Sequence, residues 1–361
     1  MADCRHPADG RSSGARGRKP SSGGDHILDP ARRHRLDAAG VVVLRILALA
    51  AAYYVAAEVG LLFEIVRGQV TPLWPPTGIA LVGLFVLGVR ALPGITLGAF
   101  LLNAPLGPSL PAAALIAAGN TLAPLCGYLM LRRAGFRTDL GRPADVLALV
   151  FLGALAGTLV SATTGAGALV LAGAVPSAAY WPTWSVWWAG DAMGVLVIAP
   201  VLLVARSRWP GAMPPFRWVE AAVLLAGTAA VTWFVATSTW SAMFLVFPLL
   251  IWAALRFHQH GATLCVLIVC VLTTHAAAIG AGGFGQLDLF STMVLLQAFN
   301  GCVAMTALLL AALMQQRDRA RHDVEQACEQ LTELVTHLDG ALRARRERLA
   351  GWAVRGGRPE E

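Results

Sequence analysis

Apolar runs follow one another in quick succession from about residue 40 to residue 314, and they constrain the fold more than any other feature. A helix that crosses a membrane needs about 20 apolar residues. Only 14% of the residues are charged, against about 25% in an ordinary soluble protein. Too little polar surface is present to cover this much apolar mass in water. We therefore expect an all-α fold, a polytopic transmembrane helical bundle embedded in a lipid bilayer.

Ten apolar runs can be counted, and three of them are short. The runs 78–90, 93–104 and 242–255 have fewer residues than a full crossing needs. Tilted or re-entrant half-spans would reduce the count, so eight crossings is the alternative within a range of eight to ten. We favour ten full crossings, because a re-entrant hairpin would pull Arg90 or Arg256 toward lipid. The runs are 40–63, 78–90, 93–104, 110–131, 145–172, 185–205, 218–236, 242–255, 262–280 and 289–314.

Arginines are distributed unequally between the loops that join these runs. They fall in every second loop, whereas the intervening loops carry only Arg67. By the positive-inside rule, the arginine-bearing loops and both termini are cytoplasmic, and the number of crossings is even. The arginines of the alternate loops are Arg32, Arg33 and Arg35; Arg90; Arg132, Arg133, Arg137 and Arg142; Arg206, Arg208 and Arg217; Arg256; and Arg317, Arg319 and Arg321.

The two ends of the chain differ in composition from the apolar region, 37–314. Residues 1–36 are rich in Gly, Ser, Arg and Pro, which predicts a disordered basic tail. Residues 315–349 are polar and carry an apolar stripe at spacings of three and four, which predicts a cytoplasmic helix and short coiled coil. We expect a homodimer through 313–341, the alternative being a solvated helix lying on the bilayer. Residues 350–361 are predicted to be a disordered tail.

The segment 73–80, LWPPTGIA, opens the second apolar run. Pro75 and Pro76 lack amide donors and fix the backbone, so a helix can start directly after them. Trp74 offers a flat amphipathic face at the outer interface, and Gly78 follows within the first turn. The functional interpretation is a rigid lip over a pocket. The alternative is an ordinary helix start with an aromatic anchor.

The segment 184–194, WSVWWAGDAMG, places Asp191 about two turns inside the membrane. An ionisable group at such a depth is costly and is a candidate functional residue. Trp187 and Trp188 are suited to stacking on a ligand or to anchoring at the headgroups. Gly190 and Gly194 are four residues apart, which allows close helix contact. The alternative is that Asp191 only hydrogen-bonds a neighbouring helix.

Other polar residues in the apolar runs lie at a similar depth. Glu58, His275 and Gln297 all fall in the outer half according to the loop topology. Polar side chains must face the bundle rather than lipid. Together with Trp74 and Asp191 they are expected to line one outward-opening cavity, although each alone is often an interhelical hydrogen-bonding group. The ligand-binding or signalling candidates are therefore Trp74, Pro75, Pro76, Gly78, Trp187, Trp188, Asp191, Glu58, His275 and Gln297.

No motif in the chain indicates catalysis. A P-loop, a dinucleotide fingerprint, an HExxH helix and a GxSxG elbow are all missing from the sequence. Cysteine and histidine show no spacing typical of a metal site. We therefore expect no enzyme, no catalytic residue, no cofactor and no metal. The arginines lie between apolar runs, so we expect no nucleic-acid partner.

The segments 73–103 and 184–203, taken together and in this order, resemble the bacterial membrane-associated sensor domain family (MASE, type one). The resemblance covers about 40–314 and implies a bundle of about eight helices. It also implies a sensory input domain like those of histidine kinases and diguanylate cyclases. Such members normally precede an output module, which is missing here, so a stand-alone sensor or a truncated remnant is expected. The matching motif positions are Trp74, Pro75, Pro76, Gly78, Pro93, Gly94, Gly98, Asn103, Trp188, Gly190 and Asp191.

These observations combine into one functional hypothesis. The chain is expected to be a multi-pass sensory protein of the bacterial inner membrane. A small ligand of unknown identity, or a membrane partner, would bind in the outer half of the bundle. The C-terminal helix would relay the signal to a cytoplasmic partner such as a histidine kinase or diguanylate cyclase. The alternatives are a solute transporter and a scaffold subunit of a membrane complex.

Overall fold

The computed structural model describes residues 30–62, 71–207, 214–238 and 242–355. The chain divides into two units, residues 1–44 and residues 45–361. In the first unit, the described residues form the start of helix α1, and Val41, Val43 and Leu44 are exposed on it. The paragraphs below concern the second unit.

Helices make up almost all of the described chain, and no strand occurs within it. Prolines occupy the first turn of α2, α3, α4, α5, α8 and α9. A backbone N–H in the first turn has no hydrogen-bond partner within the helix, so proline, which lacks this N–H, loses nothing there. The α-helices are α1 (Pro30–Leu61), α2 (Pro75–Leu87), α3 (Leu92–Leu106), α4 (Leu110–Arg133), α5 (Pro143–Ala148), α6 (Leu159–Leu171), α7 (Tyr180–Ala205), α8 (Pro215–Thr237), α9 (Phe247–Ala278) and α10 (Leu289–Arg355). The shorter elements are η1 (Gly88–Ala91), the π-helical η2 (Leu149–Ala156), η3 (Ser177–Ala179), η4 (Met243–Val246) and η5 (Gly282–Gln286).

Helix extends into both of the predicted disordered tails. α1 begins at Pro30, before the expected end of the tail at residue 36, and α10 continues through Gly340 to Arg355. The prediction of disorder was therefore wrong for 30–36 and 350–355. Once a helix has nucleated in the apolar segment, each further residue adds a hydrogen bond, so the helix propagates into polar sequence. Residues 1–29 and 356–361 lie outside the described residues.

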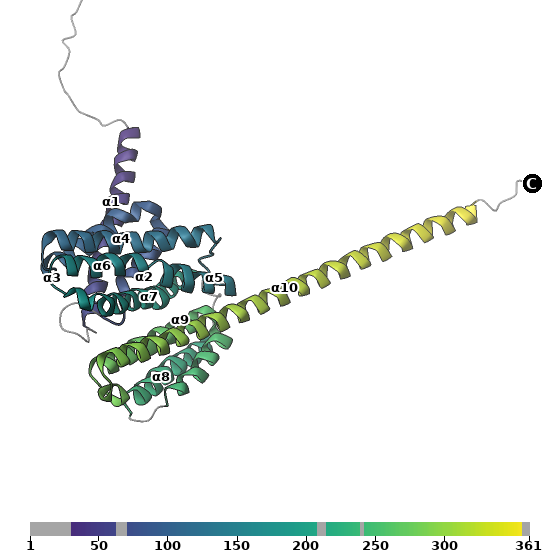
Figure 1. Ribbon diagram of the computed structural model, residues 1–361. Coiled ribbons are helices and arrows are strands. Elements are labelled where there is room, and N and C mark those ends of the chain that lie inside the picture. The colour runs from purple at the N-terminus through teal and green to yellow at the C-terminus, as the bar shows by residue number, and fades with distance from the viewer. Residues whose placement is uncertain (1–29, 63–70, 208–213, 239–241, 356–361) are drawn as a thin grey trace, which may run out of the picture. The chain divides into compact units, whose positions relative to one another are not determined.

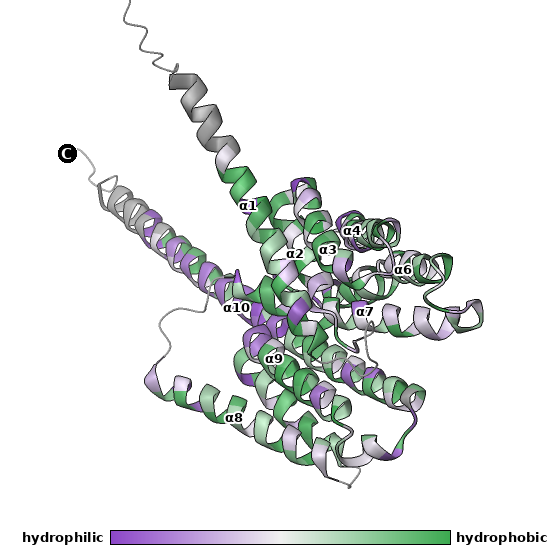
Figure 2. Ribbon diagram, turned by 90° about the vertical axis from the view of Figure 1, so that its left-hand side faces the viewer, coloured by the Kyte–Doolittle hydropathy of each residue, from purple (hydrophilic) through white to green (hydrophobic). Residues whose placement is uncertain are grey.

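Eight helical stretches in the described chain are long and apolar enough to cross a membrane. Their outward faces carry large apolar side chains, such as Leu171 at 82% exposure and Phe290 at 64%. Figure 2 shows this hydrophobic character along the helices of the bundle. Patches of this extent are rare on soluble proteins, and the acyl chains of lipids would cover them. The chain is a multi-pass membrane protein, as the apolar runs predicted.

The stretch Pro75–Leu106 is a hairpin of two antiparallel helices. Ile46 of α1 lies against Gly94 of α3, and Ala50 lies against Gly98, so α1 and α3 run in the same direction. Leu49 of α1 lies against Gly83 of α2, whereas Gly60 lies against Pro75, so α1 and α2 run in opposite directions. The chain reverses at Gly88, which has φ 62° and ψ −151°, a backbone conformation that glycine adopts without steric cost.

The stretch Met243–Gln286 contains a second reversal. At its start, Met243 packs beside Ala236 near the end of α8, whereas Arg256 pairs with Glu220 near the beginning of α8. After His258, which has φ 50° and ψ −138°, the chain runs back along α8 and reaches Trp233 at His275. The fold therefore contains two helical hairpins, each followed by a long helix.

These hairpins bear on the number of crossings, which the sequence places between eight and ten. The described chain has ten helical segments where ten apolar runs were predicted, but α2 has 13 residues and is about 20 Å long. The hydrocarbon core is about 30 Å thick. Re-entrant or tilted halves, the alternative from the sequence, fit this length better than full crossings do. The count of eight apolar stretches lies at the lower end of the expected range.

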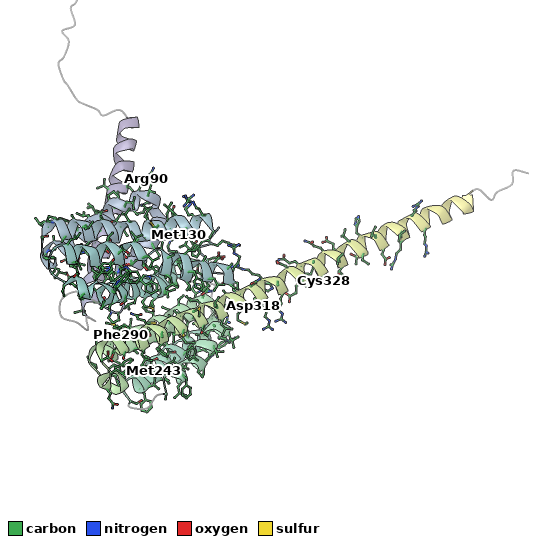
Figure 3. The ribbon with its side chains drawn as sticks, in the orientation of Figure 1. Arg90, Met130, Met243, Phe290, Asp318 and Cys328 are labelled. Carbon is green, nitrogen blue, oxygen red and sulfur yellow. The ribbon has the colours of Figure 1, made fainter. Side chains whose placement is uncertain are left out.

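α10 is one continuous helix of 67 residues. Its first part packs against α9, and Figure 1 shows it continuing beyond α8 and α9. Phe290 lies in the packed part, whereas Asp318 and Cys328 mark the passage into the extended part (Figure 3). Every side chain described between 321 and 346 is exposed. The residues of the predicted coiled-coil stripe, Val324, Ala327, Leu331, Leu334 and Leu338, are among them, and the side chain of Ala341 is outside the described residues.

Candidate functional site

A buried carboxylate lies where α2, α6 and α7 meet. Asp191 on α7 is 1% exposed. Its Oδ1 accepts a hydrogen bond from Thr77 on α2 at 2.5 Å, and its Oδ2 accepts one from Ser161 on α6 at 2.5 Å. Burial removes the carboxylate from water, and the two hydroxyl donors replace part of the hydrogen bonds that water would make to it. Asp191 thus joins three helices that lie apart in the sequence.

Glycines bring the backbone before α2 close to α7. The Trp74 N–H donates to Gly190 O at 3.0 Å, and a Cβ at Gly194 would collide with the Trp74 carbonyl oxygen. A Cβ at Gly78 would collide in turn with Gly194 O. The prediction that Gly190 and Gly194 permit close contact is confirmed. This contact places Trp74 beside Asp191.

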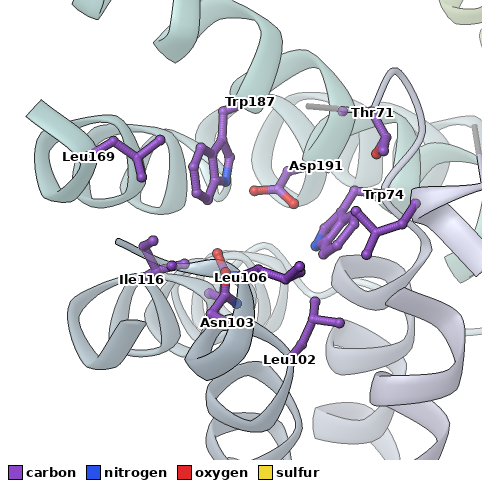
Figure 4. Close-up of a pocket in the computed structure, with 13 residues that line it drawn as sticks. Thr71, Trp74, Leu102, Asn103, Leu106, Ile116, Leu169, Trp187 and Asp191 are labelled. Atoms are coloured by element: carbon purple, nitrogen blue, oxygen red, sulfur yellow. The ribbon is translucent and has the colours of Figure 1, made fainter. Parts of the chain in front are cut away.

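A pocket opens next to Asp191, between the indole rings of Trp74 and Trp187. Figure 4 shows the nitrogen of the Trp187 ring facing the Asp191 carboxylate, with Trp74 on the other side. The pocket measures about 630 Å³ with its open mouth included. Among the described residues, its lining contains one carboxylate and no basic side chain. The lining is Leu61, Thr71, Trp74, Leu102, Asn103, Leu106, Gly107, Ile116, Asn120, Leu169, Trp187, Gly190 and Asp191.

Two buried polar atoms beside this pocket lack a well-formed hydrogen bond. The Tyr53 hydroxyl is fully buried near Trp74, Asn120 and Asp191, yet no atom lies in hydrogen-bonding geometry to it. Asn120 is 6% exposed, and its Oδ1 is also without a hydrogen-bond partner. Buried polar atoms are rarely left unsatisfied. This end of the bundle therefore has spare hydrogen-bonding capacity.

The structure brings only part of the predicted site together. Trp74, Trp187 and Asp191 line the pocket. Pro75, Pro76 and Gly78 are buried in the first turn of α2 directly behind it. These positions agree with the helix start predicted from the two prolines.

The other predicted site residues do not line the pocket. Trp188 donates its indole N–H to Leu155 O at 2.8 Å, in the π-helical η2. Glu58 is exposed on α1, and His275 stacks on Trp233 of α8. The expectation of one cavity shared by Glu58, Trp74, Asp191, His275 and Gln297 was wrong, because equal depth in the membrane does not determine which face of a helix a residue occupies.

Gln297 contacts the pocket indirectly. Its Nε2 donates to Pro72 O at 2.6 Å, which ties α10 to the segment Thr71–Trp74. The Gln297 Oε1 is buried without a hydrogen-bond partner. The segment Thr71–Trp74 is therefore held both by α7, through Gly190, and by α10.

Sequence reasoning missed the hydroxyl partners of the carboxylate. Thr77 belongs to the quoted segment 73–80, but nothing in its type indicated that it would reach Asp191. Ser161 lies in an apolar run with small residues on both sides, and Tyr53 lies in the first run. Ser, Thr and Tyr are common in membrane helices, so these positions carry no signal without knowledge of the packing. No group of three or more metal-ligating side chains occurs in the described part of the chain.

A second polar cluster lies at the opposite end of the bundle, where α10 leaves it. Asp139, in the loop before α5, accepts from Arg319 of α10 at 3.0 Å and from the Gly141 N–H. His258 pairs with Asp318 of α10 at 2.8 Å. Partial burial opposes ionisation of Asp139, but the Gly141 N–H and the guanidinium groups of Arg319 and Arg137 outweigh it. They hold the pKa of Asp139 below its usual value.

Comparison with known proteins identifies the family. The MASE1 family model matches residues 45–318, which comprise most of the chain and both motif segments. The chain belongs to the MASE1 family. The match ends at Asp318, one residue before Arg319 binds Asp139, so it includes Asp191 and the pocket beside it. No curated protein and no solved structure matches this MASE1 chain. It is an integral membrane protein of a sensory-type family.

Proposed function

We propose that this MASE1 protein is a membrane sensor that detects a small ligand in the pocket beside Asp191 and relays its presence through α10. The hydrogen bond from Gln297 to Pro72 O, at 2.6 Å, is the observation that carries the proposal. It connects the segment that presents Trp74 to the pocket with α10, which continues beyond α8 and α9. In this proposal the protein is not an enzyme.

The connection works mechanically because α10 is unbroken. The helix runs without interruption from Leu289 through Gln297 to Arg355. A ligand shifts a conformational equilibrium only by binding one state better than another. A ligand that contacts Trp74 would favour one position of Thr71–Trp74, and Gln297 would follow through its hydrogen bond. A rigid helix then transmits this shift to its far end.

The far end of α10 supports the same role. Asp318 and Arg319 hold α10 to His258 and Asp139 at the point where it leaves the bundle. Beyond this point the exposed apolar stripe at Leu331, Leu334 and Leu338 favours association with a second copy. We propose that the pocket faces outward from a bacterial inner membrane and that both termini are cytoplasmic. A histidine kinase or a diguanylate cyclase is the proposed cytoplasmic partner.

A double-variant experiment tests the relay without a known ligand. Asp191→Asn perturbs the pocket, and amide hydrogen exchange is measured on residues 315–342 of the full chain in nanodiscs. We expect Asp191→Asn to change exchange in this segment, and we expect Gln297→Leu to abolish that response. Gln316→Leu, at an exposed position on the same helix, is the matched control and leaves the response intact. A response that persists in the Gln297→Leu background, or no response at all, contradicts the relay.

A further inference from the structure

We infer that the pocket beside Asp191 binds a small primary ammonium ion that carries a short apolar tail. The inference rests on the proposed function, because it names the chemical class of ligand for the same pocket. Four features of the described residues lead to it: the charge of the lining, the placement of the two indole rings, the unsatisfied oxygens and the apolar wall.

The charge of the lining favours a cation. Asp191 is the one ionisable side chain among the described lining residues. Thr77 and Ser161 donate hydroxyl protons to its two oxygens, an arrangement suited to the ionised carboxylate. A carboxylate has about four acceptor positions, so both oxygens can accept a further donor from the pocket. A buried charge without a counter-ion is costly, and a cationic ligand would supply the missing charge.

The Trp74 indole is placed to bind the same cation. Trp74 and Trp187 flank the Asp191 carboxylate on two sides of the pocket (Figure 4). The faces of tryptophan rings attract cations more strongly than other aromatic side chains do. Because Trp187 turns its N–H edge toward the carboxylate, Trp74 is the ring that adds cation–π attraction to the negative charge of Asp191.

The unsatisfied oxygens distinguish a primary ammonium from a quaternary one. Asn120 Oδ1 lines the pocket and makes no hydrogen bond, and the Tyr53 hydroxyl is buried beside Trp74 and Asn120 without a hydrogen bond of good geometry. Both oxygens accept hydrogen bonds. A primary ammonium carries three N–H donors, which can serve the Asp191 carboxylate and Asn120 Oδ1, the one of these two oxygens that lines the pocket. A quaternary ammonium carries none and would leave both oxygens unsatisfied.

Most of the remaining wall of the pocket is apolar, and Thr71 and Asn103 are its polar members. The aliphatic side chains offer no hydrogen bond to a ligand, which favours a short apolar tail on the ammonium group. These side chains are Leu61, Leu102, Leu106, Ile116 and Leu169.

Four probes with the same butyl tail test the inference. Butylammonium, butyltrimethylammonium, butyrate and 1-butanol are titrated against the full chain in zwitterionic nanodiscs by ligand-detected NMR, with empty nanodiscs as the blank. We expect butylammonium to bind at least tenfold more tightly than each of the other three, because it alone can make a charge-assisted hydrogen bond to the carboxylate. Equal binding of butylammonium and 1-butanol would overturn the inference, since only the tail would then be recognised.

Variants locate the binding. Asp191→Asn is expected to weaken butylammonium binding at least tenfold, and Asn120→Leu is expected to weaken butylammonium but not butyltrimethylammonium. Glu58→Gln removes an exposed carboxylate outside the pocket and should have no effect. Arg67 lies in the stretch 63–70, outside the described residues. If butylammonium binds only to the Arg67→Gln variant, the Arg67 guanidinium takes the place of the cation in the wild type, and the inference is overturned.

The outcome separates this inference from the proposed function. If butylammonium fails to bind while Asp191→Asn still changes hydrogen exchange on 315–342, the ligand class is wrong and the relay stands. If butylammonium binds but exchange on α10 does not respond, the ligand class stands and the relay is wrong.

Discussion

At the scale of single residues, neutral hydroxyls hold the most buried charge of the site. Asp191 relies on Thr77, 114 positions away, and on Ser161, 30 positions away. Arginines are instead engaged at the opposite end, where Arg319 and Arg142 bind Asp139 and Asp145. Asp191 thus has no basic partner among the described residues that line its pocket, whereas Asp139 and Asp145 at the other end are paired with arginines.

The Asp139 carboxyl predicts a pH-dependent stability at the end where α10 leaves the bundle. Its pKa is lower in the folded protein than in the unfolded chain. A lowered folded-state pKa stabilises the fold above the unfolded value, about 3.9, and this contribution is lost as the pH falls through the folded value. Asp139→Asn should therefore lower the melting temperature near neutral pH, and the difference from wild type should shrink below about pH 3.9.

Thermal unfolding in detergent at several pH values measures this difference. Asp323→Asn, at an exposed carboxylate further along α10, is the matched control and should melt like wild type throughout. A difference between Asp139→Asn and wild type that stays constant down to pH 3 would contradict the assigned ion pair.

At the scale of elements, glycines determine how closely α2 approaches α7. A Cβ at Gly194 would overlap the Trp74 carbonyl oxygen, whereas a Cβ at Gly227 on α8 would meet no atom within 4 Å. The two positions share a residue type and a helical backbone but differ in their surroundings. They therefore offer a direct comparison between a packing glycine and a glycine in open space.

Gly194→Ala should destabilise the fold by about 1–3 kcal/mol, the usual cost of overpacking. Gly227→Ala should be neutral or stabilising by up to about 1 kcal/mol, because alanine has the higher helix propensity. Unfolding in detergent, followed by circular dichroism, compares the two. Equal stability of both variants would show that α2 and α7 are not in close contact at Trp74.

The extended part of α10 predicts self-association through its apolar stripe. Leu331 and Leu334 are 61% and 59% exposed, with no neighbour in the described chain to cover them. The double substitution Leu331→Asp and Leu334→Asp should convert a dimer to a monomer in light scattering. Thr332→Asp with Thr336→Asp adds the same charges to the polar side and should leave the dimer intact. A wild-type monomer would support the alternative of a solvated helix on the bilayer.

At the scale of the whole molecule, arginines and apolar runs together predict one orientation in the membrane. The Asp139 end, with its arginine-bearing loops, should face the cytoplasm, and the pocket end should face outward. Alkaline phosphatase, which is active only outside the inner membrane, should be active when fused after Gln286 and inactive when fused after Gly340. An active fusion after Gly340 would invert the topology and remove the proposed cytoplasmic relay.

The hairpins mark the limit of what apolar length could predict about the fold. Apart from the start of α1 and the end of α10, which extend into polar sequence, the run boundaries agreed with the helices, because a stretch that avoids water is visible in its composition. Composition did not show that the chain reverses its direction between neighbouring short runs. Gly88 and His258 reverse the chain in similar conformations, but only glycine carries a sequence signal for a positive φ.

The sequence alone determined that this is a helical membrane protein, because hydrophobic length acts locally along the chain, and the segments 73–103 and 184–203 indicated the MASE1 family by resemblance. It also singled out Trp74, Trp187 and Asp191 as candidates. Only the tertiary structure decided that these three share a pocket while Glu58 and His275 do not, and that Gln297 contacts Pro72 instead. Depth in the membrane follows from position along a helix, but contact depends on which faces of the helices pack together, and that is a property of the whole bundle.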